Sequence, residues 1–579
     1  MFSMLLRKPG GMPTASFRGH DLTVLRGACP RERRRGHATL HMNFETLKTY
    51  RRPAAQRRLA VLAAATGLLM AAGWGWAAPA PDAATAPALT PSPEASPAGK
   101  ALRDDVDKIL AGLGLEKVTT AVRIIALAEP ATRQPVEPLY ALRADQPMIP
   151  ASNLKLLTTA ACLDRLGPDW RIRTYIGRLP VEGKKDERDL AIIGGGDPNF
   201  SGRFYGRDTV GAFRQWADAL KKAGVRSLGR VVLDDTLFDG VLQHPHWPAD
   251  QRAEWYEAPV SALSLCDNCV EVHVAPGAKA GDPARVWLEP PSAYAAVEGA
   301  IATVAERSQH NFSLQRIIDE KASPPMRIRA GGRYHAGAAE AVEYRTVADP
   351  TAFFGAALIE ALRAEGIAVA GPAVRGRLTD AGGKARPEFA PDIVHSSRLD
   401  ATIAVAAKRS QGMYAESLMK LLGAWGPTPA GANPLPPRQG TWPNGAGEIR
   451  RWMVERGIPP EGCVIDDGSG LSKENRLTPV AVTELLAVMY ERHGETFVQL
   501  LAVAGQDGSL ARRMRRTPAE GRVFGKTGYV LGSSALSGYV RARSGRVVAF
   551  SILMNDVPWG ELWRARDAQD KICVRLVEY

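Results

Sequence analysis

Apolar residues at the two ends of the chain alternate with polar ones in short runs, and helical spacing recurs between these runs. Strand-like runs are clearest in residues 119–129, 138–145, 522–530, 534–544 and 546–556. Apolar residues at helical spacing mark residues 102–114, 399–423, 444–457, 478–494 and 561–579. Strands from both ends with helices between them predict an α+β fold, in which an antiparallel sheet is packed by helices.

The middle of the chain has a different pattern. Residues 176–390 contain many short strand-like runs broken by Gly and Pro, with helical spacing at 209–224 and 350–366. A chain of 579 residues is long enough for more than one hydrophobic core. We therefore expect one domain to combine residues 101–175 with residues 391–579, and residues 176–390 to be an insertion.

The positive charge of the chain is concentrated at its N-terminus. Residues 1–58 contain thirteen Lys and Arg against three acidic residues, so this leader carries +10 of the net +13 and the remaining chain only +3. The remaining chain therefore gives no support to a nucleic-acid partner. Met42 lies at a suitable distance before the next apolar run, so residues 1–41 could be an upstream extension of the reading frame.

The segment after the leader has the composition of an export signal. Residues 59–78 form an apolar run, small residues suited to cleavage follow near 77–80, and residues 79–100 form a Pro/Ala-rich linker. We expect a cleaved signal peptide and a periplasmic or other extracytoplasmic location. The run is also long enough to remain as a membrane anchor, and peripheral contact with the membrane is a further expectation.

Six cysteines are too few for a disulfide scaffold in a chain of this size. Cys266 and Cys269 form a C-x-x-C motif, and Cys463 with Cys573 is a further candidate bridge that sequence cannot establish. A zinc or redox site at the motif would lack a second C-x-x-C, so we expect a local structural pair and no metal or cofactor. The histidines near the motif are His244, His246 and His273.

A serine and a lysine are three residues apart in the stretch "MIPASNLKLLTTAA", where Pro150 suits a helix entrance. A hydroxyl needs a base to become a nucleophile, and Lys155 would share a helix face with Ser152 if burial or another cation lowers its pKa. This spacing alone is weak evidence for a catalytic pair, because a serine that caps a helix, followed by a solvated lysine, gives the same pattern. Ser417 and Lys420 repeat the spacing.

Two later segments add weight to the first pair. Ser410 opens a helical stretch in "RSQGMYAESLMK", and "GKTG" lies inside a strand-like run near the C-terminus. A glycine there lets a ligand approach the strand edge, whose free N–H groups can bind an extended peptide. Lys526 would supply positive charge for a carboxylate. An S-x-x-K early, a serine motif in the middle and a K-T-G late form the set of penicillin-binding proteins and serine β-lactamases.

From about residue 105 to the C-terminus, the chain resembles the low-molecular-mass class C penicillin-binding proteins, the D-alanyl-D-alanine carboxypeptidase/endopeptidases. The segments that carry the resemblance are "PASNLKLLTTAACLDRLGPDWRIRT", "GGGDPNFSG", "APVSALSLCDN", "IDDGSGLSKENRLTP", "VAGQDGSLARRM" and "GKTGYVLGSSALSGYV". The resemblance implies a penicillin-recognising serine transferase fold built from both ends of the chain, with two accessory domains inserted between the first and second motifs. Turn chemistry accounts for "GGGDP" and "DDGSGLS", and "GQDGSLARRM" is expected at the rim of the site.

The resemblance also implies catalytic roles by matching position. Ser152 would attack the carbonyl of D-Ala-D-Ala, or of a D-Ala-diaminopimelate cross-link when the protein acts as an endopeptidase. Lys155 would accept the serine proton, and Ser410 would relay a proton to the leaving amine. The implied partners are peptidoglycan stem peptides and cross-links, with β-lactams as covalent inhibitors that acylate the same serine.

The K-T-G segment would bind the substrate. Lys526 and Thr527 would hold the terminal carboxylate and Gly528 would keep the strand edge accessible. The backbone N–H groups of Ser152 and Tyr529 would form the oxyanion hole, in which each donor contributes about 3 kcal/mol to lowering the barrier.

One position departs from the family pattern. The middle motif of the family is Ser-x-Asn, and here Gly412 stands where the asparagine belongs. Gln411 is adjacent but would point elsewhere on a helix. The first hypothesis is therefore an active serine DD-peptidase. The alternative is a catalytically weakened protein that binds wall peptides or β-lactams. A dedicated β-lactamase is a minor third hypothesis, because the sequence shows no evident base for deacylation.

Overall fold

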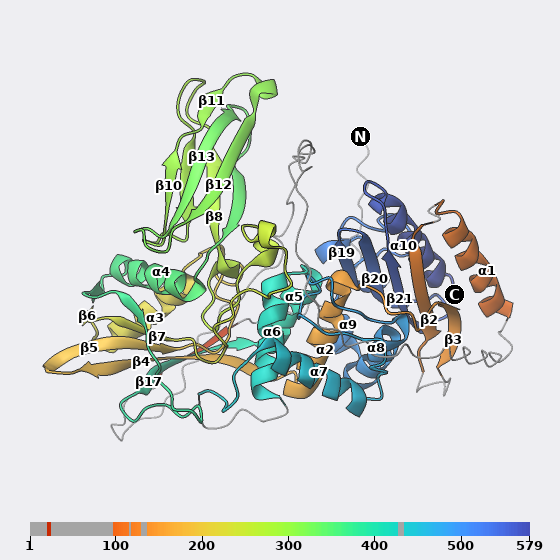
Figure 1. Cartoon of the computed structure of the whole chain (residues 1–579), viewed down its shortest axis with the longest axis horizontal. Helices are drawn as coiled ribbons and strands as arrows, with labels where there is room; N and C mark the ends of the chain where they lie inside the picture. The colour runs from red at the N-terminus through yellow and green to blue at the C-terminus, as the bar shows by residue number, and fades with distance from the viewer. Residues whose placement is uncertain (1–19, 25–96, 115–116, 129–135, 427–433) are drawn as a thin grey trace, which may run out of the picture.

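The computed structural model describes residues 20–24, 97–114, 117–128, 136–426 and 434–579. Figure 1 shows two lobes with a group of helices between them. One lobe holds a sheet made from both ends of the chain, and the other holds the sheets of the middle segment. None of the helices in the described ranges is long and apolar enough to cross a membrane. The apolar run at 59–78 lies outside these ranges.

The first lobe is built on a six-stranded sheet that confirms the expected antiparallel arrangement. Its order is β18-β19-β20-β21-β2-β3, and every neighbouring pair is antiparallel. The two N-terminal strands join the C-terminal ones through the β2–β21 ladder, in which Val122 faces Ile552. The strands are β2 (Thr119–Ala126), β3 (Glu137–Leu142), β18 (Ala502–Val503), β19 (Val523–Val530), β20 (Ser533–Arg541) and β21 (Val547–Asn555).

Helices cover both faces of this sheet. Helices α1 (Pro97–Ala111) and α10 (Leu562–Val577) pack together on one face, and α8 (Pro479–His493) packs on the other. Successive residues of a strand point to opposite faces, so Ile124 joins the core under α1 and α10 while Ile125 joins the core under α8. Helices on both faces explain why strands β2, β20 and β21 are buried along almost their whole length.

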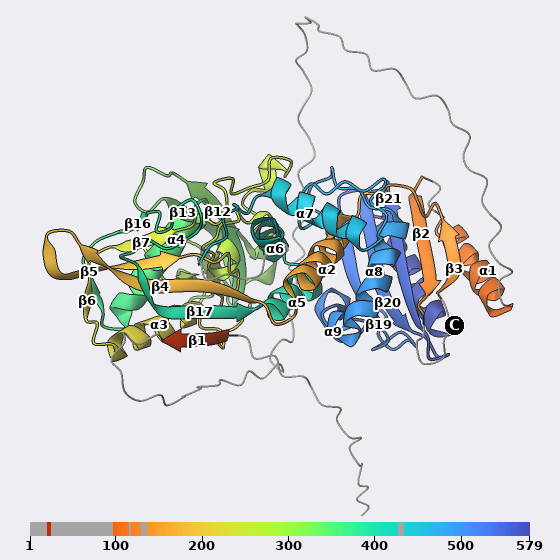
Figure 2. The same ribbon diagram turned by 90° about the horizontal axis from the view of Figure 1, so that it is seen from below.

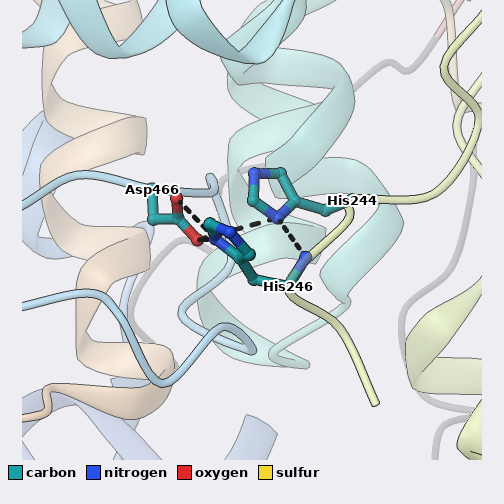
Figure 3. A group of neighbouring side chains, drawn as sticks. All are labelled: His244, His246 and Asp466. Atoms are coloured by element: carbon teal, nitrogen blue, oxygen red, sulfur yellow. Dashed lines mark hydrogen bonds and ion pairs between the residues drawn. The ribbon is translucent and has the colours of Figure 1, made fainter. Parts of the chain in front are cut away.

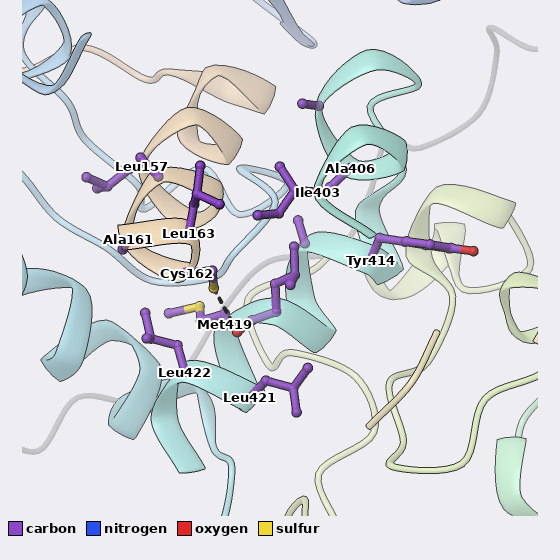
Figure 4. Close-up of a cluster of buried hydrophobic side chains, with 14 of the residues drawn as sticks. Leu157, Ala161, Cys162, Leu163, Ile403, Ala406, Tyr414, Met419, Leu421 and Leu422 are labelled. Carbon is purple, nitrogen blue, oxygen red and sulfur yellow. Dashed lines mark hydrogen bonds between the residues drawn. The ribbon is translucent and has the colours of Figure 1, made fainter. Parts of the chain in front are cut away.

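A layer of helices lies between the two lobes and forms a large part of one continuous core (Figure 4). Leu157, Leu163, Ile403 and Leu422 come from three different helices of this layer and are all buried. The helices are α2 (Leu154–Leu166), α5 (Leu399–Lys408), α6 (Gly412–Trp425), α7 (Trp442–Glu455) and the short α9 (Glu495–Val498).

The helical stretch predicted at 399–423 is two helices in the structure. Helix α5 ends at Lys408 and α6 begins at Gly412. Ser410 lies between them with a φ of +59°, in the left-handed region, which a right-handed helix cannot contain. The break places Ser410 in a connection between helices.

The second lobe is built around a mixed six-stranded sheet in the order β1-β17-β4-β5-β7-β16. Helices α3 (Gly211–Lys222) and α4 (Pro350–Ala364) contact each other and share one apolar core with this sheet. The insertion boundaries expected at 175/176 and 390/391 fall within two of its strands. The strands are β1 (His20–Val24), β4 (Arg171–Val181), β5 (Lys184–Ile193), β7 (Val231–Asp234), β16 (Ala373–Arg375) and β17 (Ala390–Arg398).

Further small sheets complete the middle segment, and one group of strands projects from the lobe in Figure 1. The projecting strands β10 (Ala295–Gly299), β11 (Ala302–Val304) and β12 (Asn311–Ile318) all pair with β13 (Met326–His335). The remaining strands are β8 (Cys269–Ala275), β9 (Arg285–Glu289) and β14 (Ala341–Thr346) in one sheet, and β6 (Ser227–Leu228) with β15 (Ala368–Val369) in another.

The N-terminal region differs from expectation at two points. Strand β1 comes from the predicted basic leader and runs along β17 at the sheet edge (Figure 2). Helix α1 begins at Pro97, earlier than the folded start expected at Ala101, so the end of the predicted linker is helical. Cleavage after residue 77 would remove β1 and leave β17 as an edge strand.

The expected local pair of Cys266 and Cys269 is not formed, and neither is the candidate bridge between Cys463 and Cys573. Cys266, Cys269, Cys463 and Cys573 are all buried free thiols. Cys266 and Cys269 instead donate to backbone carbonyls, at 3.5 Å in each case, and Cys463 and Cys573 belong to separate apolar cores. Burial raises the pKa of all four thiols, which keeps them protonated.

Candidate active site

Ser152 lies in a tight turn that leads into α2. The turn is a 3₁₀ element (Ala151–Asn153), and Ala151 has a φ of +47°. Asn153 fixes the turn to β19, since its Nδ2 donates to the backbone oxygen of Lys526 at 2.8 Å. We expected Ser152 in the first turn of the helix. The structure places it one short turn earlier, in the 3₁₀ element, where the residue is half-buried.

Lys155 contacts the serine from the first turn of α2. Its Nζ lies 3.0 Å from Ser152 Oγ and donates to the backbone oxygen of Ser469 at 2.7 Å. The side chain is 2% exposed. Burial lowers the pKa of Lys155 to about 8, against the opposing charges of Glu416 and Asp467. A lysine with this pKa has an appreciable neutral fraction near physiological pH and can accept a proton.

A second lysine and serine meet beside the first pair. Lys526 Nζ donates to Ser410 Oγ at 2.8 Å and to the backbone oxygen of Thr527 at 2.8 Å. Burial, together with the charge of Lys155, lowers the pKa of Lys526 well below its usual range. The two lysines are therefore close enough to influence each other, and three segments remote in sequence converge on one site.

The edge of β19 passes directly beside the serine turn. A Cβ on Gly528 would lie 2.6 Å from the backbone oxygen of Pro150, so only glycine fits there. We expected this glycine to allow the approach of a ligand, whereas the closest group is the protein's own turn. Strand β18 pairs with β19 only at Phe524 and Gly525. Beyond these two residues, β19 has a neighbouring strand, β20, on one side only within the described sheet. The other side of β19 is open and is suited to an extended peptide.

The other residues predicted around β19 lie at the rim. Thr527 Oγ1 donates to Ser509 Oγ at 2.9 Å, and Ser509 belongs to a 3₁₀ element (Gly508–Leu510) in the segment expected at the rim. Tyr529 is 47% exposed, and the guanidinium of Arg566 lies over its ring.

Gly412 is the first residue of α6, and its surroundings are tight. A Cβ there would lie 3.1 Å from the backbone oxygen of Tyr256, in a short segment of the insertion, and 3.9 Å from the Cβ of Ser469. The side chain of Gln411 points away as expected: it accepts from the Gly412 N–H and donates to Asp267, which pairs with Arg203.

The second Ser-x-x-K pair lies elsewhere. Ser417 is fully buried and its Oγ contacts the sulfur of Met413 at 3.5 Å. Lys420 Nζ donates to Asp239 Oδ1 at 2.6 Å and to the backbone oxygen of Val241 at 2.7 Å. The Lys420–Asp239 ion pair therefore joins α6 to the insertion.

Comparison with known proteins agrees with this geometry. Residues 102–577 match the model of the D-Ala-D-Ala carboxypeptidase 3 (S13) family. The chain belongs to this family. It is therefore a serine-type D-Ala-D-Ala carboxypeptidase by class, and the resemblance to class C penicillin-binding proteins is confirmed.

Individual relatives cover most of the chain. It is 34% identical over 494 residues to a D-alanyl-D-alanine carboxypeptidase of Actinomadura sp. (strain R39), covering 83% of this chain and 85% of that protein. It is 27% identical to Carboxypeptidase DacB of Mycolicibacterium smegmatis, covering 72% and 74% of the two chains. The fold matches the crystal structure of penicillin binding protein 4 (dacB) from Haemophilus influenzae with a TM-score of 0.64 at 19% identity, covering 82% of this chain and 99% of that one.

Sequence reasoning missed the residues that support the family site. Glu416 is fully buried, and burial together with Asp467 raises its pKa to about 7. Asp467 organises the predicted "DDGSGLS" turn by accepting from the backbone N–H groups of Gly470 and Ser472. The same turn presents the Ser469 carbonyl to the amine of Lys155. Every residue type has a backbone carbonyl, so the sequence could predict the turn but not that its Ser469 carbonyl contacts Lys155.

Proposed function

We propose that this protein is an active serine DD-peptidase that trims and cleaves peptidoglycan peptides through an acyl-enzyme outside the cytoplasmic membrane. The observation that carries the proposal is the 3.0 Å contact between Ser152 Oγ and the buried amine of Lys155. A half-exposed hydroxyl beside a lysine of lowered pKa has the properties of an activated nucleophile.

In the acylation step, neutral Lys155 takes the Ser152 proton as Oγ attacks the carbonyl carbon of the penultimate D-alanine. The negative charge that develops on the carbonyl oxygen is stabilised by the N–H groups of Ser152 and Tyr529. The C–N bond then breaks, and the departing amine takes a proton from Ser410. Ser410 is suited to this because its Oγ already accepts from Lys526, which leaves its own hydrogen free to donate. The proton that Lys155 took from Ser152 passes back to Ser410, so Lys155 is neutral again before the second step.

In the second step, water attacks the ester formed on Ser152, and the same lysine accepts the proton of the water. The ester bond breaks, Ser152 regains its proton, and the shortened peptide leaves. During acylation, until the D-alanine leaves, Lys526 and Thr527 hold the terminal carboxylate of the substrate. A bound carboxylate favours the charged form of Lys526, opposing the effect of burial on its pKa.

The open side of β19 supports two kinds of substrate. A stem peptide ending in D-Ala-D-Ala would align there for carboxypeptidase action, and a D-Ala-diaminopimelate cross-link would do so for endopeptidase action. A β-lactam presents a carboxylate beside a strained amide, so it would acylate Ser152 in the same orientation. The structure of Haemophilus influenzae penicillin binding protein 4 complexed with a β-lactam has the same fold, with a TM-score of 0.61.

Labelling and product release together test the proposal. Fluorescent penicillin should label the purified protein and the Ser417→Ala variant, but not Ser152→Ala. In a separate sample without penicillin, the parent should release D-alanine from a muramyl pentapeptide. Ser417→Ala is the matched control because it removes the serine of the other Ser-x-x-K pair. No labelling of the parent, or labelling that survives in Ser152→Ala, would refute the mechanism.

The second candidate function, a weakened protein that binds wall peptides or β-lactams without useful turnover, rests on Gly412. Two features favour the active enzyme instead. The Ser469 carbonyl supplies Lys155 with an acceptor, as the missing asparagine side chain would, and the Tyr256 carbonyl lies close to where that side chain would begin.

The variant Gly412→Asn distinguishes the two functions, with Gly412→Ala as control for the added Cβ alone. For an active enzyme with a native substitute, neither variant should release D-alanine faster than the parent. A large gain in Gly412→Asn alone, from a parent that labels but barely turns over, would establish the weakened binding protein.

A further inference from the structure

Two histidines and an aspartate converge at a point that the proposed mechanism does not use (Figure 3). His244 and His246 lie on one loop of the insertion, and Asp466 lies on the loop that follows α7. Their candidate ligand atoms all lie within 4.8 Å of one another. The sequence analysis noted these histidines only beside the Cys266–Cys269 motif and expected no metal.

The separations suit three ligands of one small ion. Both imidazole Nδ1 atoms face the same carboxylate oxygen, Asp466 Oδ2, at 3.6 Å for His244 and 2.9 Å for His246. Ligands about 2.0–2.1 Å from a tetrahedral zinc ion are roughly 3.4 Å apart. An ion pair with His246 would explain the shorter contact but gives no reason for His244 to face the same oxygen.

The three side chains are held in place by neighbours. Asp466 accepts from Ser472 Oγ at its Oδ2, and its backbone N–H donates to Asn475 Oδ1 at 2.8 Å. The ring of His244 is buried and packs edge-on against Trp442, with ring centroids 5.0 Å apart. Its Nδ1 also accepts from the His246 backbone N–H at 3.3 Å, a long bond that a cation would replace. Such outer contacts orient metal ligands in known sites.

His246 is 54% exposed, so one side of the cluster faces solvent. We propose that His244, His246 and Asp466 bind a first-row divalent transition ion, of which zinc is the natural candidate, with water in the fourth position. Two imidazoles and one carboxylate are ligands that zinc takes in proteins. No electron transfer or bond cleavage is involved.

The position of the site gives the ion a structural role. Two ligands come from the insertion and one from the loop whose Ser469 carbonyl holds Lys155. The adjacent Asp467 accepts from Trp247 Nε1 at 2.9 Å, so the same two segments already meet at a second point. A bound ion would fix the insertion against the loop that positions the lysine, without contacting the reacting atoms.

A second cluster, formed by Glu271, His273 and Glu289, is the internal control. It has one imidazole instead of two, and His273 Nδ1 already bonds Glu340 at 2.7 Å. The proposal assigns binding to the first cluster, so a variant of His273 should retain it.

The test is zinc titration of the untagged, chelator-treated protein by calorimetry, with Co²⁺ as a spectroscopic probe. The parent and His273→Ala should each bind one zinc ion, melt at a higher temperature with zinc, and show the visible absorption of tetrahedral Co²⁺. His246→Ala should show none of these, and because its side chain is exposed, the variant should fold like the parent. Ser472→Ala should bind about 10- to 100-fold more weakly, because it loses an outer contact of Asp466.

Three results would overturn the proposal: no zinc binding by the parent, zinc binding that survives in His246→Ala, or binding that disappears in His273→Ala instead. Penicillin labelling of Ser152 measured on the same samples keeps this test separate from that of the proposed function. His246→Ala should still be labelled, since none of the three ligands touches the serine or its lysine.

Discussion

The chain contains two Ser-x-x-K pairs on buried helices, and only one has the surroundings of a reactive site. Lys155 contacts two neutral oxygens, from Ser152 and from the Ser469 backbone. Lys420 contacts the carboxylate of Asp239 and lies 3.7 Å from the ring centroid of Trp442. Both lysines are almost fully buried, so burial by itself does not distinguish them.

The two pairs differ in the groups that contact each lysine amine and in the exposure of each serine. Burial lowers the pKa of Lys420 as well, but the Asp239 carboxylate bonded to its amine and the adjacent Trp442 ring oppose this shift by favouring the charged form. Ser417 is completely buried and donates a hydrogen bond to the sulfur of Met413. Ser152 is only half-buried and lies beside the open side of β19. Identical spacing therefore yields a structural link in one place and a candidate nucleophile in the other.

The largest expected effect comes from removing the amine of the first pair. Lys155→Met keeps the length of the side chain but removes the base, so the rate of Ser152 acylation should fall about 10²- to 10⁴-fold. The measurement is the time course of labelling with fluorescent penicillin. Lys420→Met, assayed at a temperature where it is folded, should be labelled within a few-fold of the parent rate. Equal losses in both variants would show that the comparison of the two pairs is wrong.

The second prediction concerns stability. Lys420→Met leaves Asp239 without its cation and should lower the free energy of unfolding by about 3 kcal/mol, because one partner of a buried pair is removed. Lys408→Met, which breaks a more exposed pair with Asp507, is the control and should cost about 1 kcal/mol or less. Thermal melting of both variants beside the parent measures this. A melting temperature unchanged in Lys420→Met would contradict the structural role assigned to that lysine.

The third prediction is a pH dependence carried by the first pair. Only neutral Lys155 can accept the serine proton, and its pKa is about 8, so acylation should slow about tenfold for each pH unit below 8. Glu416 raises the pKa of Lys155, so Glu416→Gln should move this limb to lower pH. Labelling rates between pH 6 and 9 test both statements, and Ser417→Ala should follow the parent curve. A flat profile would exclude Lys155 as the titrating base.

Much of this arrangement could be predicted from the sequence. Strand-like runs in β19, β20 and β21 gave strands close to those observed, because these strands are buried on both faces. Helical spacing in α7, α8 and α10 gave the helices, because each of them buries one stripe. The three motifs gave the residues Ser152, Lys155, Ser410 and Lys526. Their convergence depends on the sheet that joins the two ends of the chain, which the resemblance implied and no local pattern does.

Other features depend on contacts that residue types do not encode. The left-handed backbone at Ser410, which divides one predicted helix into two, follows from tertiary packing. The Ser469 carbonyl beside Lys155 and the Tyr256 carbonyl beside Gly412 are backbone groups, so any residue type could supply them. The free thiols of Cys463 and Cys573 result from their separation into different cores.

The smallest expected effect separates carboxylate binding from proton transfer. Ser509→Ala removes the acceptor of the Thr527 hydroxyl, which orients the group proposed to hold the substrate carboxylate. The net loss of one hydrogen bond is about 0.5–1.5 kcal/mol, so KM for D-alanine release should rise about 2- to 12-fold while kcat and the pH profile stay unchanged. Ser264→Ala, which removes a buried serine hydroxyl bond in the insertion, should leave KM unchanged. A fall in kcat with a shifted pH profile in Ser509→Ala would instead connect the rim to the Ser152–Lys155 pair, and the separation of binding from proton transfer would be wrong.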